Sequence, residues 1–468
     1  MFGTEKFGSY VSNEWHLEGE AKKLVSPTTG EEWGKLHFAT DQTIKQAIDR
    51  VKDAPTIDLP PYERAKILWE IKDEILANQE ELAKCITLEM GKPINDARGE
   101  VIYTANYFGW FAEEVKRIYG KKIPSANGNK KVELRYEPIG PCGFITPWNF
   151  PIAMAGRKIA AALAAGCPVI VKPSSFTPVS LLLFATLCFK GELPSHSLHV
   201  LVGESGKIGK ALMNSPHIRK FSFTGSYETG KELYIQGAQT LKKATLELGG
   251  NAPLIVFDDA DLEGAVEGAI AAKFRMSGQT CVCANRLFVH KNILPDFLSL
   301  FIKKVKALKV GDPFQEETEL SRTLHPESIK KARAHIEDAL QKGAQAHLGA
   351  KEGFEPEILT GVTPDMRIFN EETFGPVAPI ITFEEEKEVI ELANATPYGL
   401  ASYFFTEGLK RAERVASALR FGIVGLNDGL PSAVEASFGG IKDSGFGREG
   451  GPTGIYEYLT EKLISQTL

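Results

Sequence analysis

The stretch PVIVKPSSFTPVSLLLF, residues 168–184, joins a short apolar strand, a polar turn and the start of an apolar helix. The strand ends near Lys172, and the helix is expected from Pro178. A strand followed so closely by a helix is typical of the βαβ unit from which parallel sheets are built. This stretch therefore predicts a parallel α/β fold, and the rest of the chain can be compared with it.

The same unit recurs on both sides. GFITP precedes a helix expected from Ile152, LHVLVG one from Gly206, and FSFTGS one from Tyr227. This alternation predicts an α/β fold with a doubly wound parallel sheet and a ligand at the C-terminal ends of its strands. After ELGGNAP the alternation starts again, which indicates a second α/β domain. Residues 41–120 have helical spacing of apolar residues, and residues 130–138 alternate like a strand.

Composition excludes several classes of protein. The 468 residues carry a formal charge of −6, with acids and bases mixed, so no basic stripe suggests a nucleic-acid or lipid partner. The longest apolar runs, residues 159–171 and 181–189, are too short to span a bilayer. The N-terminal residues do not resemble a signal peptide, and six cysteines are too few for a disulfide framework. A reducing, cytoplasmic location is expected.

Two cysteines one valine apart, Cys281 and Cys283, stand in the segment GQTCVCANR. They could be a metal half-site, a disulfide, two buried thiols, or a nucleophile with a companion. No CxxC occurs and the nearest histidine is His290, so no metal site is expected. A catalytic cysteine needs a base. Glu247, which ends a strand before two glycines, could be that base, and the amide of Asn149 could stabilise an oxyanion.

Three further segments could bind a nucleotide. FTGSYETG places Gly225, Ser226 and Gly230 between a strand and a helix, where backbone N–H groups could face a pyrophosphate. Lys172 ends a strand, where its charge could meet a ribose or phosphate, although a surface lysine is an equal alternative. Residues 445–450 match GxGxxG, but the chain ends too soon after them for a βαβ unit, so a tight turn is the better interpretation.

The motifs ITPWNFP, VKPSSFTP, FTGS, LELGG, GQTC, EETFGPV and FGG follow one another across residues 145–440. Together they resemble the aldehyde dehydrogenase superfamily over essentially the whole chain. The resemblance implies a Rossmann-type cofactor domain (1–120 and 140–246), an α/β catalytic domain (247–437) and a small β oligomerisation element (121–139 and 438–468). It also implies a homodimer or homotetramer.

The family's catalytic roles carry over to three residues. Cys281 matches the nucleophile, Glu247 the general base, and Asn149 the amide that forms the oxyanion hole with the Cys281 backbone N–H. The implied reaction passes through a thiohemiacetal and a thioester on Cys281. Glu247 then activates the water that hydrolyses this thioester. Hydride leaves to a nicotinamide cofactor, which supplies redox chemistry that side chains lack.

The resemblance also implies a cofactor site. Lys172 would bind the adenine ribose, Ser226 the pyrophosphate and Glu372 the nicotinamide ribose, with Phe374 beside the nicotinamide. The whole implied cofactor set is Thr146, Pro147, Trp148, Lys172, Ser174, Ser175, Gly225, Ser226, Leu248, Glu372 and Phe374. Members that prefer NAD usually carry glutamate where this chain has Ser175. Serine leaves room for a 2′-phosphate, which favours NADP; the alternative is that serine only loosens NAD binding.

Within the superfamily, FRMSGQTCVCANR, LELGGNAPLIVFDDADLEGAVEGA and FGGIKDSGFGREG are most similar to succinate-semialdehyde dehydrogenases. Residues matching that group's carboxylate ligands are Arg157, Arg275 and Ser432, and arginine suits a carboxylate. The chain departs from the pattern at Met276, Pro431 and Ser437. Glutarate semialdehyde therefore remains an alternative substrate, and a retired, non-catalytic homologue is the alternative outside enzymes.

The resemblance leaves Cys283 with no step in the reaction. Related succinate-semialdehyde enzymes include members in which the equivalent pair forms a reversible disulfide that switches activity off. Residues two apart in an extended segment point to the same side, at a spacing near the upper limit for a disulfide. Cys283 is thus a redox candidate, with a small packing residue as the alternative.

Overall fold

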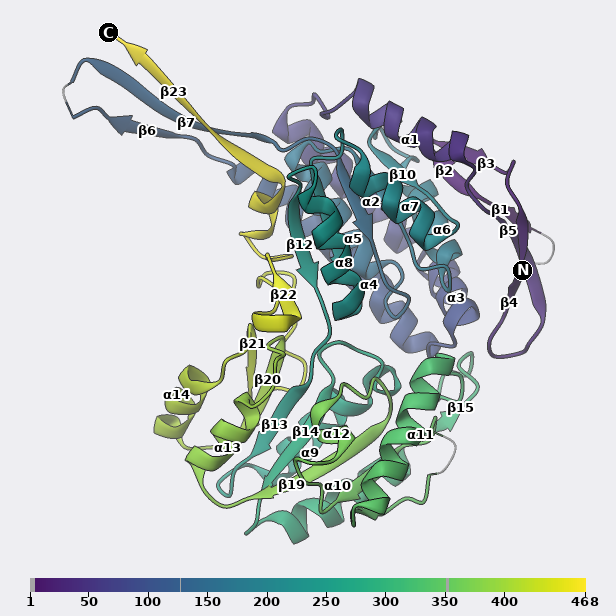
Figure 1. Ribbon diagram of the computed structural model, residues 1–468, viewed down its shortest axis with the longest axis vertical. Helices are drawn as coiled ribbons and strands as arrows, with labels where there is room; N and C mark the ends of the chain where they lie inside the picture. The colour runs from purple at the N-terminus through teal and green to yellow at the C-terminus, as the bar shows by residue number, and fades with distance from the viewer. Residues whose placement is uncertain (1–4, 127, 351–352) are drawn as a thin grey trace.

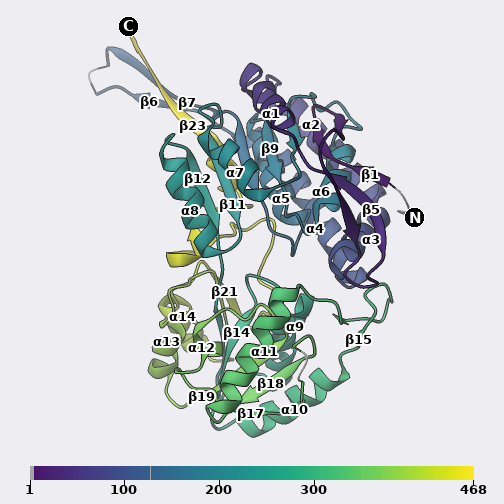
Figure 2. The same cartoon turned by 45° about the vertical axis from the view of Figure 1, so that its right-hand side comes forward.

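The structure, a computed structural model, describes residues 5–126, 128–350 and 353–468. Two α/β lobes lie one below the other, and a long β-ribbon projects from the upper lobe (Figure 1). The upper lobe contains most of the first half of the chain, and the lower lobe begins at β13. Figure 2 shows that the two lobes face each other across a narrow waist where several loops meet. The α/β fold expected from the sequence is confirmed.

The upper lobe is built on a sheet whose central parallel strands have the order β12-β11-β8-β9-β10. Their bounds are β8 (Cys142–Ile145), β9 (Val169–Lys172), β10 (Leu198–Val200), β11 (Lys220–Thr224) and β12 (Lys243–Glu247). The chain moves outward from β8 to β10 and then returns to the other side of β8. The strand order therefore reverses between β8 and β11, which is where doubly wound sheets bind ligands.

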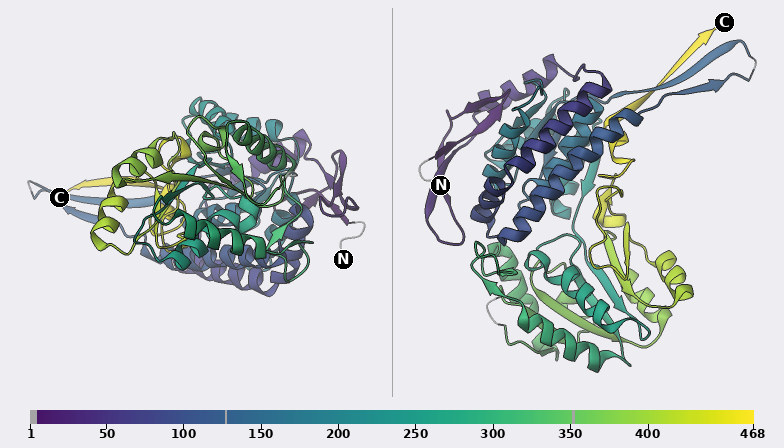
Figure 3. Two further views of the ribbon diagram at one scale, coloured as in Figure 1. Left: turned by 90° about the horizontal axis from the view of Figure 1, so that it is seen from below. Right: turned by 180° about the vertical axis from the view of Figure 1, so that it is seen from behind.

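Helices cover both faces of this sheet, so its central strands are largely buried. Val169 and Val171 of β9 pack in one core with α2–α6, whereas Ile170 packs in another with α1, α7 and α8. The bounds are α1 (Asp41–Asp53), α2 (Pro61–Ala77), α3 (Gln79–Met90), α4 (Ile94–Glu114), α5 (Ala153–Ala165), α6 (Pro178–Cys188), α7 (Ser205–Asn214) and α8 (Tyr227–Ala238). The right panel of Figure 3 shows the blue and purple helices side by side over the back of this lobe.

The lower lobe has a second parallel sheet in the order β18-β19-β14-β13-β20-β21, with β17 antiparallel at one edge. Its strands are β13 (Ala252–Val256), β14 (Ala284–His290), β17 (Gln345–Ala346), β18 (Glu357–Thr360), β19 (Val377–Phe383), β20 (Ala401–Phe405) and β21 (Ile423–Leu426). On one face lie α9 (Leu262–Phe274) and α10 (Leu294–Ala307). On the other lie α11 (Pro326–Gln341), α12 (Arg367–Asn370), α13 (Glu386–Asn394) and α14 (Leu409–Ala418). A small pair, β15 (Val310–Gly311) and β16 (Leu320–Ser321), lies apart from the sheet.

The projecting ribbon is a separate antiparallel sheet. Its middle strand is β7 (Lys130–Pro138), flanked by β6 (Lys121–Pro124) and β23 (Leu459–Thr467). The strand predicted over residues 130–138 is confirmed, and its two partners come from the segments assigned with it to oligomerisation. Apolar side chains remain exposed here, with Leu463 63% and Ile123 41% accessible.

The C-terminal segment is divided between two parts of the molecule. β22 (Gly445–Phe446) pairs with β12 of the upper sheet, and only β23 joins the ribbon. Residues 445–450 form a turn in which Gly445, Gly447 and Gly450 have φ of 108°, 87° and 70°. No α-helix follows among the described residues. The interpretation of GxGxxG as a tight turn is confirmed.

The N-terminal strands have no counterpart in the sequence predictions. They are β1 (Glu5–Phe7), β2 (Ser9–Val11), β3 (Glu14–His16), β4 (Ala21–Val25) and β5 (Glu32–His37). β2 and β3 extend the upper sheet beyond β10 with antiparallel pairing, and β1, β5 and β4 form a sheet of their own. None of the described helices is both long enough and apolar enough to cross a membrane.

Candidate active site

Cys281 lies where two pockets meet. It follows a short 3-10 segment, residues 275–278, and precedes β14. One pocket, the Glu372 pocket, opens toward the upper sheet; the other, the Arg275 pocket, opens toward α4 and α5. Cys281 and Met154 line both. A group at the sulfur can therefore be approached from two sides.

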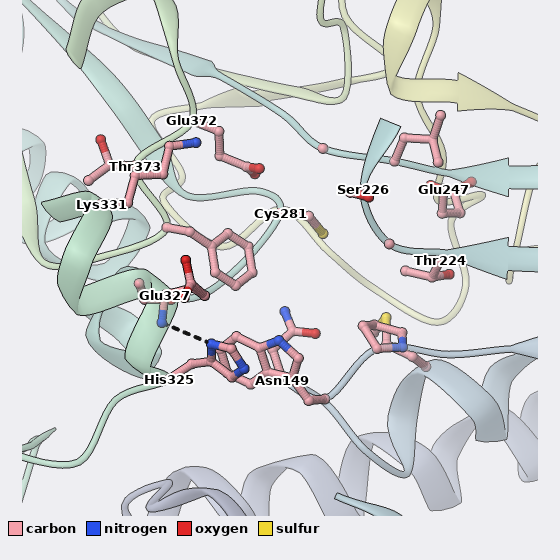
Figure 4. Close-up of a pocket in the computed structure, with 18 residues that line it drawn as sticks. Asn149, Thr224, Ser226, Glu247, Cys281, His325, Glu327, Lys331, Glu372 and Thr373 are labelled. Atoms are coloured by element: carbon pink, nitrogen blue, oxygen red, sulfur yellow. Dashed lines mark hydrogen bonds between the residues drawn. The ribbon is translucent and has the colours of Figure 1, made fainter. Parts of the chain in front are cut away.

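The Glu372 pocket brings together most of the residues predicted for catalysis and cofactor binding. It is lined by Pro147, Trp148, Asn149, Gly225, Ser226, Glu247, Leu248, Cys281, Glu372 and Phe374. Figure 4 shows the Cys281 sulfur in the middle, with Asn149 below it and Glu247 and Ser226 to the right. These residues are supplied by the C-terminal ends of β8, β11 and β12 and by two loops of the lower lobe.

The loop before Cys281 is strongly bent. Met276 and Ser277 have φ of 56° and 53°, and Gly278 has φ of 74°. A side chain at Gly278 would lie 2.3 Å from the Gly375 carbonyl oxygen. A Cβ at Gly250, the second glycine of LELGG, would lie 2.5 Å from the Cys281 carbonyl oxygen. Glycine is required at both positions because a backbone carbonyl oxygen lies too close to leave room for a side chain.

The Cys281 thiol is protonated in this environment. Burial raises its pKa to about 12, the positive charge of Arg157 lowers it, and the carboxylates of Glu372 and Glu247 raise it further. A thiol is a weak nucleophile compared with its thiolate. The site must therefore remove this proton, or gain positive charge from a bound group, before Cys281 can react.

The Asn149 amide is held ready beside the nucleophile. Its side chain is only 5% exposed and its Nδ2 donates to the backbone carbonyl of Gln279, 3.0 Å away. An amide nitrogen has two hydrogens, so one remains for a further acceptor. Gln279 in turn accepts a hydrogen bond at its side-chain oxygen from the backbone N–H of His325, at 3.0 Å. The amide and the loop carrying Cys281 are thus fixed to each other.

Glu247 ends β12 with its carboxyl group buried. It is 2% exposed, and neither oxygen has a hydrogen-bond partner among the described residues. Burial first, and the Glu449 carboxylate second, raise its pKa well above the ordinary value. A carboxylate whose pKa is raised in this way is a stronger base than an ordinary carboxylate, which suits a general base.

Lys172 is the cation at the end of β9. Its side chain is 2% exposed, and its Nζ donates to Ser205 Oγ at 2.5 Å and to Ser175 Oγ at 3.3 Å. Burial lowers its pKa to about 8. No carboxylate pairs with it in the part of the chain that the structure describes. A buried ammonium without a counterion, beside the N-terminus of α7, fits an anionic ligand.

The other predicted cofactor residues lie around Lys172 and along the Glu372 pocket. Thr146 pairs with β9 through its backbone, donating to the Lys172 carbonyl at 3.1 Å, and its buried hydroxyl has no partner among the described residues. Ser174 holds the turn by accepting from the Phe176 N–H at 3.2 Å. Ser226 caps α8 by accepting from the Thr229 N–H. These positions are contiguous across β8, β9 and β11, as a nucleotide site needs.

Glu372 and Phe374 close the pocket from the lower lobe. Glu372 accepts a hydrogen bond from the Gly250 N–H at 3.1 Å, and burial raises its pKa to about 7. Phe374, with φ of 55°, meets Trp148 edge-on with 5.8 Å between ring centres. Since a residue other than glycine rarely has positive φ, the loop holds Phe374 in a constrained position facing the pocket.

Sequence reasoning missed several residues of this pocket. His325 stacks on Trp148 with ring centres 4.6 Å apart and accepts the Glu327 N–H at 3.3 Å, the contact dashed in Figure 4. Lys331 on α11 and Thr224 at the end of β11 also line it. Thr224 belongs to the recognised FTGS motif, but His325, just before α11, and Lys331, within α11, lie in no motif that could have revealed them.

The Arg275 pocket collects the residues predicted to bind a substrate carboxylate. Arg157, Arg275 and Ser432 all line it, although they come from three distant segments. Arg157 is 1% exposed and forms an ion pair with Glu449. Arg275 is half-buried and, among the described residues, makes no hydrogen bond or ion pair. Asp96, whose carboxylate accepts from the Met276 N–H, is the acid near it.

Cys283 lines neither pocket. It is 1% exposed, and its sulfur receives a hydrogen bond from the buried Lys273 ammonium at 3.4 Å. Its contacts are thus with α9 rather than with Cys281. None of the six cysteines, all of which lie in the described ranges, forms a disulfide in this structure. No cluster of three or more His, Cys, Asp or Glu side chains suited to a metal ion occurs among the described residues.

The comparisons with known proteins agree with this geometry. The chain is 44% identical over 469 residues to a succinate-semialdehyde dehydrogenase (NADP(+)) of Escherichia coli strain K12, covering 97% of this chain and 96% of that protein. A glutarate-semialdehyde dehydrogenase of Pseudomonas putida is 44% identical over 465 residues, covering 97% of each. The crystal structure of a succinate-semialdehyde dehydrogenase from Burkholderia pseudomallei superposes with a TM-score of 0.96 at 44% identity, covering 99% of this chain and 98% of that one.

The chain also matches a model of a whole protein family. Residues 15–464 match the model of the aldehyde dehydrogenase family, whose members oxidise aldehydes with NAD or NADP. The match spans both lobes, both pockets and most of the ribbon. This chain is a member of the aldehyde dehydrogenase family.

Proposed function

We propose that the protein oxidises succinate semialdehyde to succinate, with glutarate semialdehyde as the alternative substrate. The observation that carries this proposal is Arg275, a half-buried guanidinium that lines the pocket beside Cys281 and has no partner of its own among the described residues. An arginine in this state suits a carboxylate ligand. Arg157 and Ser432, which line the same pocket, complete the binding set. The related enzymes named above support the same substrate class.

In the proposed mechanism Cys281 transfers its thiol proton to Glu247, attacks the aldehyde carbon and forms a thiohemiacetal; Glu247 releases this proton to solvent before it acts again. The second hydrogen of the Asn149 amide and the Cys281 backbone N–H stabilise the oxyanion. The nicotinamide, when bound, supplies the acceptor for the hydride. Glu247 then takes a proton from the water that hydrolyses the thioester on Cys281, and the acid is released. The unpartnered carboxyl group of Glu247 supports its role as the base.

We further propose NADP as the preferred cofactor. The nucleotide would lie in the Glu372 pocket, with Glu372 on its nicotinamide ribose and Ser226 on its pyrophosphate. Lys172 and the exposed Ser175 would hold the 2′-phosphate. The support is the buried Lys172 ammonium, which has no counterion among the described residues, and the absence of a carboxylate at Ser175.

The remaining assignments concern the assembly. The upper lobe is proposed as the cofactor domain, the lower lobe as the catalytic domain, and the ribbon as the element that joins subunits of a homodimer or homotetramer in the cytoplasm. Exposed Leu463 and Ile123 on the ribbon support the last point, because apolar side chains on a projecting strand favour contact with another protein surface. Sedimentation of the purified protein tests the assembly directly.

Reduction of NADP with a panel of aldehydes tests the function. We expect kcat/KM for succinate semialdehyde to exceed that for butanal, its neutral four-carbon analogue, by at least tenfold. Glutarate semialdehyde and pentanal form the second matched pair and decide the chain length. Arg275→Ala should raise KM for the carboxylated aldehydes far more than for the neutral ones. Equal kcat/KM for charged and neutral aldehydes in the unaltered enzyme would refute the substrate assignment.

A further inference from the structure

Arg157 belongs to two sites at once. From α5 it lines the Arg275 pocket, where its Nη2 is buried without a hydrogen-bond partner among the described residues. Its Nε forms an ion pair with Oε2 of Glu449. The guanidinium also lies 4.4 Å from the centre of the Phe438 ring, which packs against it. Arg157 therefore joins the wall of the pocket to a buried carboxylate.

Glu449 is held from three elements. Its Oε1 accepts from the Lys158 ammonium and, at 3.2 Å, from the Ser222 hydroxyl on β11. Its backbone pairs with that of Phe438 through hydrogen bonds of 2.7 and 2.8 Å. The carboxylate is 3% exposed. A buried carboxylate with two cations and a hydroxyl around it stays ionised.

Glu247 lies beside this cluster, because a Cβ at Gly439 would lie 2.9 Å from Glu247 Oε1 and 3.1 Å from Arg448 Cδ, and the preceding residue, Phe438, pairs with Glu449. The charges that face it are Glu449 from the C-terminal turn, Arg157 and Lys158 from α5, and Arg448 beside Glu449. Glu449 raises the pKa of Glu247, and each of the three cations lowers it. The Cys281 thiol is the other titratable group in range. Arg157 thus offsets the negative charge that Glu449 brings close to the base.

We propose that Arg157 is a positioning residue for Glu247, acting through its ion pair with Glu449, in addition to contacting the substrate carboxylate. The ion pair holds the Arg157 guanidinium and the Glu449 carboxylate in fixed positions near Glu247. Loss of the guanidinium leaves Glu449 with Lys158 alone and increases the negative potential at Glu247. The inference rests on the proposed function, because it takes Glu247 as the base for thioester hydrolysis.

The test uses a neutral aldehyde, so that binding of a substrate carboxylate plays no part. With butanal and saturating NADP, we expect kcat to fall at low pH, because protonation of Glu247 makes thioester hydrolysis rate-limiting. This fall is the acid limb of the plot of kcat against pH. We expect Arg157→Met to move this acid limb to higher pH by about one unit, the lower end of the range for a removed neighbouring charge. On the limb this is a tenfold lower kcat. Arg157→Lys, which keeps the charge, should restore the limb.

Two variants make the result unambiguous. Glu449→Gln removes the opposite charge and should move the limb to lower pH, which no general loss of stability would produce. Arg275→Met removes a cation from the same pocket and should leave the position of the limb in place. The inference is overturned if the limbs of Arg157→Met and the unaltered enzyme coincide. If Arg157→Met does not fold, an unmoved limb in Glu449→Gln overturns it instead.

These outcomes separate the inference from the substrate assignment. A lack of preference for carboxylated aldehydes would refute the proposed substrate without moving the limb measured with butanal. An unmoved limb would refute the role of Arg157 while leaving the substrate preference intact. Normal turnover in Glu247→Gln would remove the base on which the inference depends.

Discussion

Replacing Ser175 with glutamate should convert the enzyme from NADP toward NAD. Ser175 Oγ lies 3.3 Å from the Lys172 ammonium, so a carboxylate at this position would reach the same cation that we assign to the 2′-phosphate. Glutamate would thus compete for Lys172 and repel the phosphate. It would also accept hydrogen bonds from the free ribose hydroxyls of NAD. All three effects change the cofactor ratio in the same direction.

The magnitude follows from the exposure of Ser175. Two unit charges about 4 Å apart interact by about 1 kcal/mol in water and about 4 kcal/mol near a protein surface. Because Ser175 is exposed, we take about 2 kcal/mol, which corresponds to a loss of roughly thirtyfold in NADP binding. Lys172 is buried and its pKa is about 8. KM for NADP should therefore rise as pH increases through 8, because the free enzyme loses the ammonium there.

The assay is kcat/KM for both cofactors at a fixed, saturating concentration of succinate semialdehyde. The ratio of NADP to NAD should fall by roughly thirtyfold or more in Ser175→Glu. Ser175→Gln is the matched control, since it has nearly the same size and no charge, and it should change the ratio much less. The reasoning is refuted if the unaltered enzyme prefers NAD, or if the glutamate and glutamine variants have the same ratio.

Three other changes test the site around the nucleophile. Glu247→Gln should retain a burst of reduced cofactor and then stall, because the thioester forms but is not hydrolysed; stopped-flow absorbance measures both phases, and full turnover would contradict the role of the base. Gly250→Ala places a Cβ 2.5 Å from the Cys281 carbonyl oxygen, so kcat should fall by at least tenfold, with a lower Tm by calorimetry. Peroxide should inactivate the enzyme reversibly if Cys283 forms a disulfide with Cys281, whereas reductant should not restore Cys283→Ala, in which Cys281 oxidises without a disulfide partner. Because Cys283 contacts Lys273, equal and irreversible inactivation of both proteins would instead identify Cys283 as a packing residue.

The strand–turn–helix units were readable from the sequence because they are local. The strands β8, β9, β10 and β11 are short, and the helix that follows each of them, α5 to α8, begins within one residue of the expected position. The ends of parallel strands meet at one edge of a sheet, so motifs at those ends could be expected to converge. Asn149, Ser226 and Glu247 do converge, in the Glu372 pocket. The N-terminal strands were not foreseen, and three of them, β1, β2 and β3, have only three residues, which is too short for alternation to be recognised.

What only the tertiary structure decided is which charges face one another. Lys158 and Glu449 are 291 residues apart and belong to a helix and a glycine-rich turn that carry no common pattern. His325 reaches Trp148 across the two lobes from a segment without a motif. Electrostatic and stacking contacts depend on distances between surfaces that meet after folding. The sequence alone determined the fold, the family resemblance and the candidate nucleophile, base and amide, whereas the burial of Glu247 and the pairing of Arg157 arise from packing.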